Sequence, residues 1–183
     1  VTIPFIRAVA GPMDYTPGIF FQDLASVTGG KNNSWVNATL ANQLALYVTL
    51  YSPLQMAADL PEHYAQFMDA FQFIKDVDID WIQSKYLLAE PGEYVVIARQ
   101  GKKNGQWFCG GVTDDQKRTL EVPMNFLEAG KTYEATIYAD AENADYKENP
   151  QAYKIWKQNV TSEDILSMTM ARGGGFAISF KEL

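Results

Sequence analysis

The sequence predicts an α+β chain in which a strand, a loop and helices precede an all-β antiparallel sandwich. Between residues 39 and 74, apolar residues recur every three or four positions, which is the spacing of buried helix faces. After residue 78 they instead alternate in short runs that are separated by turn residues. This change divides the chain into a first part, 1–75, and an all-β domain, 79–183, which we expect to be joined by the linker Lys75–Asp80 with few other contacts between them.

The first part begins with one predicted strand and continues with helices. Thr2–Ala10 is a β-like run, and it leads into Gly11–Gly18, which is too rich in Gly and Pro to be the interior of an element. The helix that starts at Thr39 is apolar on almost all sides, so we expect it to be buried. A second short helix is expected at Ser52–Gln55, which resembles a capping box, and a third runs through Tyr64–Ile74.

The all-β part contains eight short apolar runs with turn-like separators. The triplet Gly173–Gly175 is one such separator, and it reads as a tight hairpin turn. Eight short strands spaced in this way are typical of an antiparallel sandwich. The predicted strands are Trp81–Leu88, Glu93–Arg99, Gln106–Val112, Arg118–Val122, Thr132–Ala139, Ala152–Thr161, Ile165–Ala171 and Phe176–Lys181.

The composition excludes several classes of protein. With 47% apolar and 20% charged residues among 183, the chain can build a sizeable core. Its 15 basic and 22 acidic residues give a net charge of −7, and Lys102-Lys103 and Lys117-Arg118 are its only basic pairs of note, so we expect no nucleic-acid partner. In the most apolar helix the longest uninterrupted apolar run is 44–48, so we expect no membrane span.

Few residues offer catalytic or metal-binding chemistry. The single cysteine, Cys109, lies in a predicted strand without a basic neighbour in sequence, so we interpret it as a small buried hydrophobe. The single histidine, His63, lies at a helix start, where we expect an exposed structural role. The neighbouring aspartates 76, 78 and 80, and the pair Asp114-Asp115, fall in connecting segments and suit turns; the calcium-loop pattern is not met. We therefore assign no catalytic residue and no metal ligand to this chain.

Segments within the first 62 residues carry a family resemblance. In order and spacing, Ile3–Arg7, Gly11–Gly18, Ala41–Tyr47 and Tyr51–Pro61 resemble the C-terminal part of glycoside hydrolase family 97. These bacterial α-glucosidases and α-galactosidases have a (β/α)8 barrel followed by a β-sandwich. The resemblance covers essentially the whole chain, although beyond Trp81 it rests on the strand pattern. Ile6 departs from it, because the family more usually has Thr before the Arg.

The resemblance implies that residues 1–75 are the end of the catalytic barrel, and that the chain is a piece of a longer product. The family cleaves α-glycosidic bonds with a pair of carboxylates and a glutamate-bound Ca²⁺, and those groups would lie upstream of Val1, so the chain alone would be inactive. Its partners would be the rest of the barrel and an α-linked oligosaccharide, in a periplasmic or secreted bacterial enzyme. The strand Thr2–Ala10 and the helix Leu40–Tyr51 would then lack their packing partners, so 1–75 should be unstable alone while 79–183 folds independently.

The loop that follows the strand is the expected substrate-binding segment. In barrel enzymes the loops at the C-terminal ends of the strands hold the substrate. We expect Asp14 either to contact a sugar hydroxyl or to bond to the loop amides around 13–16. Met13 and Tyr15 either line the pocket wall or pack the loop, and Arg7, on the strand, is expected to pair with a carboxylate.

Two other functions compete with a barrel end. A noncatalytic carbohydrate-binding module would expose Trp81, Trp107 or Trp156 so that a glycan could stack on them. A subunit-interface domain is the third hypothesis. Three aromatic side chains exposed in one line would favour the module, whereas a broad apolar patch around Tyr47, Phe67 and Phe71 would favour a missing barrel.

Overall fold

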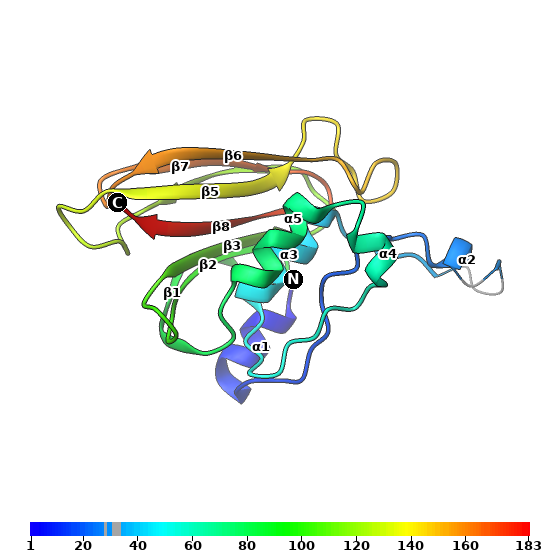
Figure 1. Cartoon of the computed structure of the whole chain (residues 1–183), viewed down its shortest axis with the longest axis horizontal. Coiled ribbons are helices and arrows are strands. Elements are labelled where there is room, and N and C mark those ends of the chain that lie inside the picture. The colour runs from blue at the N-terminus through cyan, green and yellow to red at the C-terminus, as the bar shows by residue number, and fades with distance from the viewer. Residues whose placement is uncertain (28, 31–33) are drawn as a thin grey trace.

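The computed structural model describes residues 1–27, 29–30 and 34–183, which form two β-sheets with helices against one of them (Figure 1). The helices are α1 (Ile3–Ala10), α2 (Leu24–Val27), α3 (Leu40–Thr49), α4 (Pro61–Tyr64) and α5 (Met68–Asp76). The strands are β1 (Trp81–Glu90), β2 (Tyr94–Gly101), β3 (Trp107–Thr113), β4 (Arg118–Pro123), β5 (Tyr133–Asp140), β6 (Tyr153–Val160), β7 (Ile165–Met170) and β8 (Gly175–Glu182).

The predicted β-sandwich is confirmed. Strands β1-β2-β3-β8-β5-β6 form one antiparallel sheet, and β4-β7 form a second. All eight predicted strands are present, and their ends differ from the expected ones by at most two residues. The reason is local: in β7, for example, Leu166, Met168 and Met170 are buried while the residues between them are exposed. One apolar core lies between the sheets and includes side chains of both.

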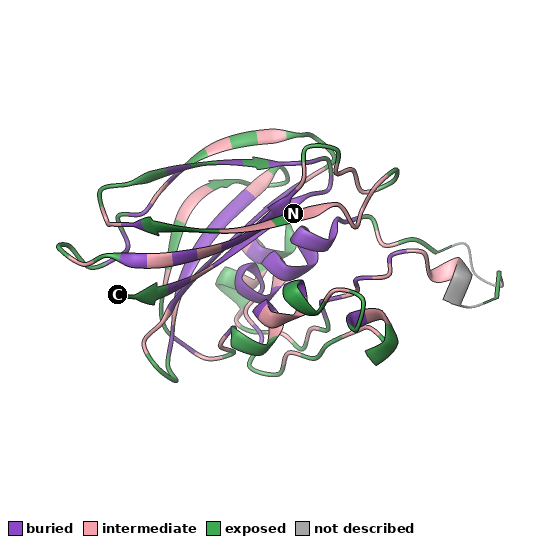
Figure 2. Cartoon of the chain, turned by 45° about the horizontal axis from the view of Figure 1, so that its top comes forward, coloured by how far each residue is buried: buried purple, intermediate pink, exposed green. Residues whose placement is uncertain are grey.

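The helices cover the other face of the six-stranded sheet. Leu44 and Val48 of α3 share a second core with Phe73 of α5, Phe108 of β3 and Tyr138 of β5. Figure 2 shows α3 buried along almost its whole length between the sheet and the remaining helices. The expectation of few contacts between the two parts is therefore wrong, because the helix that we predicted to be buried packs on this sheet.

The predicted strand Thr2–Ala10 is wrong, because the segment is the helix α1. Pro4 lies in its first turn, where a fixed φ and a missing N–H are compatible with a helix. Ile3, Ile6 and Val9 are three positions apart and form an exposed stripe; Val9 is 92% exposed. An open strand edge at this segment is thus not a feature of the structure.

The other helices also differ from the prediction. Residues 52–58 are not helical: the Ser52 hydroxyl donates to the Leu54 carbonyl at 2.7 Å, and the Gln55 amide donates to the carbonyls of Tyr47 and Leu50, at the end of α3. The third helix is divided into α4 and α5 by a turn at residues 65–67. In both places, side-chain and turn hydrogen bonds satisfy the backbone instead of a continuous helix.

The triplet Gly173–Gly175 does not close a hairpin. It carries the chain from β7 in the small sheet to β8 in the large one, so the two strands that it joins are not paired with each other. Gly173 has a φ of +63°, a conformation that glycine adopts without strain.

Candidate functional site

The loop that contains Met13, Asp14 and Tyr15 is held by main-chain and side-chain hydrogen bonds. The Met13 N–H donates to the Tyr51 carbonyl at 3.2 Å, and Tyr15 forms an isolated parallel bridge with Gln55. Asp14 is exposed, whereas Met13 and Tyr15 are half-buried. The assignment of Asp14, Met13 and Tyr15 to substrate binding stays a prediction.

The end of this loop is anchored to α3. The Gln43 side-chain oxygen accepts hydrogen bonds from the N–H groups of Gly18 (3.0 Å) and Ile19 (3.2 Å). Gly18 has a φ of +91°, and a Cβ there would lie 2.6 Å from the Tyr47 hydroxyl oxygen. Any larger residue at position 18 would therefore separate the loop from α3.

Tyr15, but neither Met13 nor Asp14, lines a cavity of about 530 Å³. The cavity lies between α1, α3, the end of β3 and the loop that follows β7, and Asn42, Asp114 and Tyr146 also line it. Burial raises the pKa of Tyr15, so its phenol stays protonated and can donate a hydrogen bond at neutral pH. The structure thus brings one of the three expected residues to a pocket and leaves the other two outside it.

Arg7 does not pair with a carboxylate. It donates to the carbonyl oxygens of Gly11 at 2.8 Å and Pro12 at 2.6 Å. These carbonyls follow the last turn of α1, where backbone acceptors lack partners within the helix. The expected ion pair is therefore wrong, because Arg7 lies in the last turn of a helix and not on a strand.

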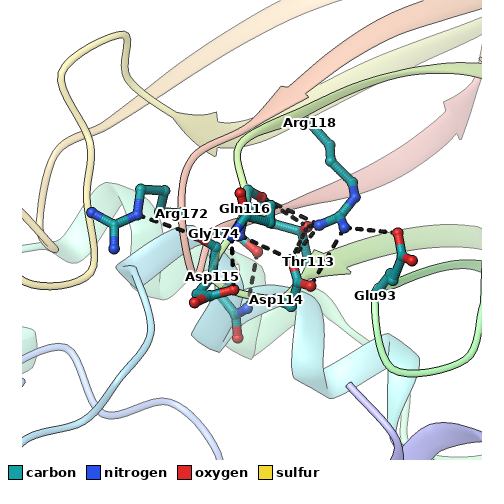
Figure 3. A network of polar contacts seen from close by, with 9 residues as sticks. Glu93, Thr113, Asp114, Asp115, Gln116, Arg118, Arg172 and Gly174 are labelled. Atoms are coloured by element: carbon teal, nitrogen blue, oxygen red, sulfur yellow. Dashed lines mark hydrogen bonds and ion pairs between the residues drawn. The ribbon is translucent and has the colours of Figure 1, made fainter.

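One wall of the cavity is a network of charged residues at the turn between β3 and β4 (Figure 3). The Arg118 guanidinium contacts Asp114 and donates to Glu93 and to the Thr113 hydroxyl at 2.8 and 2.7 Å. Although burial opposes the shift, hydrogen bonds from Arg118 and the Gln116 N–H hold the pKa of Asp114 below its usual value. The carboxylate stays ionised and braces the turn, which confirms the turn role expected for this segment.

Arg172 extends the network across the loop that follows β7. Its Nε donates to the Asp115 carbonyl and its Nη1 to the Asp145 carboxylate, both at 3.2 Å. The network thus joins four loops by ion pairs and main-chain contacts. The carboxylates of Glu93, Asp114 and Asp145 are paired with arginines, and that of Asp115 accepts a hydrogen bond from Gln116, so none is an acid poised for proton transfer.

A buried carboxylate that sequence reasoning missed lies at the end of β5. Asp140 accepts hydrogen bonds from the N–H groups of Ala171 (2.8 Å) and Gly175 (2.9 Å). Burial raises its pKa to about 6, against the opposing effect of these bonds and of Thr39. A Cβ at Gly174 would lie 1.9 Å from the carboxylate. Asp140 therefore ties the β7–β8 connection to β5. The only sign of this role in the sequence is the position of Asp140 at the end of a predicted strand.

Histidine and cysteine have structural roles. The His63 ring is half-buried: its Nδ1 lies 2.5 Å from an Asp59 oxygen, and it stacks on Phe21 with 4.4 Å between ring centroids. It is therefore not the exposed residue that we expected. Cys109 is fully buried, as predicted, and burial raises the pKa of its thiol.

Neither a metal site nor a membrane-spanning helix is found in the described ranges. Within residues 1–27, 29–30 and 34–183, no three His, Cys, Asp or Glu side chains gather closely enough to hold a metal ion. Over the same residues no helix has the length and apolarity needed to cross a membrane.

The aromatic surface expected of a stacking module is absent from the described chain. Trp81 and Trp107 are 8% and 5% exposed, and Trp156 is half-buried against the core. The three tryptophans therefore do not form the line of exposed aromatic side chains that would favour the module. Tyr47 is buried too, because α3 packs on the sheet, so it contributes to no exposed apolar patch.

Comparison with known proteins adds to this geometry. A family profile described as "Glycosyl-hydrolase 97 C-terminal, oligomerisation" matches residues 80–181. A protein named retaining alpha-galactosidase from Bacteroides thetaiotaomicron is 37% identical over 99% of this chain and 27% of its own length. A probable retaining alpha-galactosidase from Streptomyces bingchenggensis is 32% identical over 96% of the chain and 24% of its own. The chain thus spans about a quarter of the length of these relatives.

Solved structures agree with the sequence matches. A glycoside hydrolase family 97 enzyme from Pseudoalteromonas sp. strain K8, in a complex with acarbose, superimposes with a TM-score of 0.93 at 48% identity, over 100% of this chain and 28% of that one. A beta-arabinopyranosidase at 22% identity, with a TM-score of 0.73, shares the fold alone. The profile covers more than half of the chain and all of the sandwich except the last residue of β8. This chain therefore belongs to glycoside hydrolase family 97.

Proposed function

We propose that this chain is the non-catalytic C-terminal part of an α-glycosidase that hydrolyses α-galactosidic or α-glucosidic bonds with retention of configuration. The observation that carries this proposal is the match of 99–100% of the chain to only 27–28% of family 97 proteins, one of which is named a retaining alpha-galactosidase. The carboxylates at the cavity support it too, since Asp114 is paired with Arg118 and Asp115 accepts a hydrogen bond from the Gln116 side chain.

Residues 1–75 adjoin the catalytic barrel in this proposal. The support is the α1 stripe of Ile3, Ile6 and Val9, which is 48%, 55% and 92% exposed. Such a stripe is unfavourable in water, and contact with the barrel would remove it from solvent. The loop Met13–Tyr15 lies beside the same helix, so it would face the barrel and its substrate.

The whole enzyme would bind Ca²⁺ through residues outside this chain, and it would be periplasmic or secreted. Both points follow from the family resemblance. No step of the reaction is assigned to residues of this chain, whose part is to support the barrel and to position the loop Met13–Tyr15.

A second role, subunit assembly, is favoured by the word oligomerisation in the family description. Of the two edges of the large sheet, β6 carries Lys154 and Lys157, which discourage pairing with another strand. The other edge, β1, carries a single lysine, Lys85, and exposes Ile82 (57%) and Tyr86 (50%). We place the contact with a second copy at β1.

Two measurements test the proposal. The 183-residue chain should not hydrolyse p-nitrophenyl α-galactoside or α-glucoside, with or without Ca²⁺; turnover that purifies with the protein would overturn the non-catalytic assignment. The full-length product that carries this chain should hydrolyse one of these substrates and release the α-anomer first, as followed by NMR. Release of the β-anomer, or no hydrolysis, would contradict a retaining α-glycosidase.

A further inference from the structure

A second hollow, of about 620 Å³, lies at the other end of β3 from the Tyr15 cavity. It is formed by strands β1 to β3, by the hairpin loop between β2 and β3, by the segment between β4 and β5, and by the end of β8. We call it the amide groove, because four side-chain amides line it: Gln83, Gln100, Asn104 and Gln106.

The strand register explains why two of the amides, Gln83 and Gln100, point into the groove; Asn104 and Gln106 lie in the loop between β2 and β3. Gln83 lies opposite Gln100, which lies opposite Trp107, and Trp107 lies opposite Phe180. Directly opposed residues of antiparallel strands project to the same face of a sheet. Trp107 and Phe180 belong to the core between the two sheets, so the row continues outward from the core as polar groups.

The amides are held in place by one another. Gln83 Nε2 donates to Gln100 Oε1 at 2.8 Å, and Gln100 Nε2 donates to the Gly105 carbonyl at 3.0 Å. Asn104 accepts from the Gln106 N–H at 3.0 Å and donates to its side-chain oxygen at 3.3 Å. Each side-chain donation uses one N–H of a group that has two, and each amide oxygen has two lone pairs. The row therefore offers donors and acceptors at fixed positions.

The charges of the groove residues sum to zero. Lys131 lies between Glu128, at 2.8 Å, and Glu182, at 3.1 Å, and Lys181 adds a second positive charge. Two cations and two anions leave no net charge to attract a phosphate, a carboxylate or an amine. Trp107 and Phe126 add a narrow apolar wall, since they are only 5% and 9% exposed.

We propose that the amide groove is a non-catalytic binding site for a neutral oligosaccharide. A sugar hydroxyl both donates and accepts hydrogen bonds, so a row of carboxamides matches successive hydroxyls, whereas a neutral groove gives a charged ligand no advantage. Because the aromatic rings are buried, binding rests on hydrogen bonds and not on stacking, and we expect affinities in about the millimolar range. The site does not depend on the reaction proposed above.

The side-chain amides are also the reporters that test the proposal. In ¹H–¹⁵N NMR spectra of the 183-residue chain, maltotriose or raffinose should shift the NH₂ signals of the four amides and the Trp107 indole signal, with saturation. In Gln83→Ala and Gln106→Ala, these shifts should fall at least fivefold at equal ligand concentration. Gln116→Ala, an exposed glutamine at the other end of β3, should retain them in full.

Several outcomes would overturn the proposal. These are no shift with either sugar up to about 50 mM, shifts confined to the Tyr15 cavity, or larger shifts with glucuronate, the anionic control, than with the neutral sugars. If Gln83→Ala loses its spectral dispersion, Gln106→Ala decides the question alone. If the full-length product bound sugar at the groove without hydrolysing either substrate, the proposed reaction would be disproved and the binding site would still be supported. Failure of the reaction and failure of the binding site are therefore distinguishable.

Discussion

Arg99 Nε in β2 donates a hydrogen bond of 2.6 Å to the carbonyl oxygen of Val48 in the last turn of α3. Arg99 is 5% exposed, and its guanidinium also donates to the Ser84 hydroxyl and lies over the rings of Tyr51 and Trp81. Burial lowers its pKa, yet the negative end of the α3 dipole favours the cation there. One side chain thus joins the helical part to the sandwich.

Replacing Arg99 should weaken the whole fold. Arg99→Met keeps most of the side-chain volume but leaves the buried Val48 carbonyl without its donor, so we expect a loss of roughly 2–4 kcal/mol in the free energy of unfolding, measured in urea. Lys85→Met, at an exposed position on β1, should change it by less than about 0.5 kcal/mol. Equal effects of the two variants would show that the Arg99 contact contributes nothing.

Gly110 of β3 permits the close approach of α3. A Cβ at this position would lie 2.8 Å from the Ala45 carbonyl oxygen and 2.9 Å from Val48 Cβ. Gly110→Ala should therefore lower the free energy of unfolding by about 2–3 kcal/mol and shift the unfolding transition of the entire chain. Gly130→Ala is the control: its Cβ meets nothing within 4 Å, and only a φ of +79° opposes it, at about 1 kcal/mol. A cost for Gly110→Ala no larger than that of Gly130→Ala would mean that α3 is not packed on the sheet.

Asp140 makes stability fall as pH rises. Its pKa is about 6 in the folded chain and 3.8 ordinarily, so its contribution is fully present below about pH 4 and is lost as pH rises through 6. Two pKa units correspond to roughly 3 kcal/mol. We expect the free energy of unfolding of the wild type to fall between pH 3.5 and 7 by up to about that amount more than that of Asp140→Asn, as measured by denaturant titrations at each pH.

The exposed Asp164 serves as the control for this titration. Hydrogen bonds from Thr161 lower its pKa, so its contribution is present above the ordinary pKa and is lost as pH falls. The difference between wild type and Asp164→Asn should therefore run in the opposite direction. A difference of the same sign for both aspartates would contradict the raised pKa of Asp140.

Amide hydrogen exchange should be slower in α3 than in α1. In the monomeric chain, amides 44–48 should exchange slowly because both faces of α3 are covered, whereas amides 5–9 should exchange fast because Pro4 is the buried residue of α1. Rapid exchange in α3 would restore the view that 1–75 depends on a missing partner. Protection of α1 equal to that of α3 in a dilute monomer would show that the exposed stripe has no bearing on its stability.

Self-association should depend on the β1 edge. Ile82→Lys places a charge on an exposed apolar position of this edge and should weaken the association at least tenfold in sedimentation equilibrium. Ile165→Lys, on the small sheet and 62% exposed, is the matched control and should have no effect. A wild-type chain that stays monomeric up to millimolar concentration, or an effect confined to Ile165→Lys, would place assembly elsewhere.

The sequence alone determined the eight strands, the buried helix and the family. Alternation in a run such as Tyr133–Tyr138 is a local property of the sequence, so it can be recognised without knowledge of the fold. The burial of α3 followed in the same way from apolar residues on almost all its sides.

Only the tertiary structure decided what covers α3 and which residues form sites. The contact between Arg99 and Val48, the approach of α3 to Gly110, and the row from Gln83 to Phe180 join segments that are distant in sequence, and local periodicity carries no information about such pairing. For the same reason the sequence predicts a strand at Thr2–Ala10, because its short apolar run fits either periodicity. In the structure Pro4 lies in the first turn of a helix, and Arg7 donates hydrogen bonds to the carbonyls that follow the end of this helix.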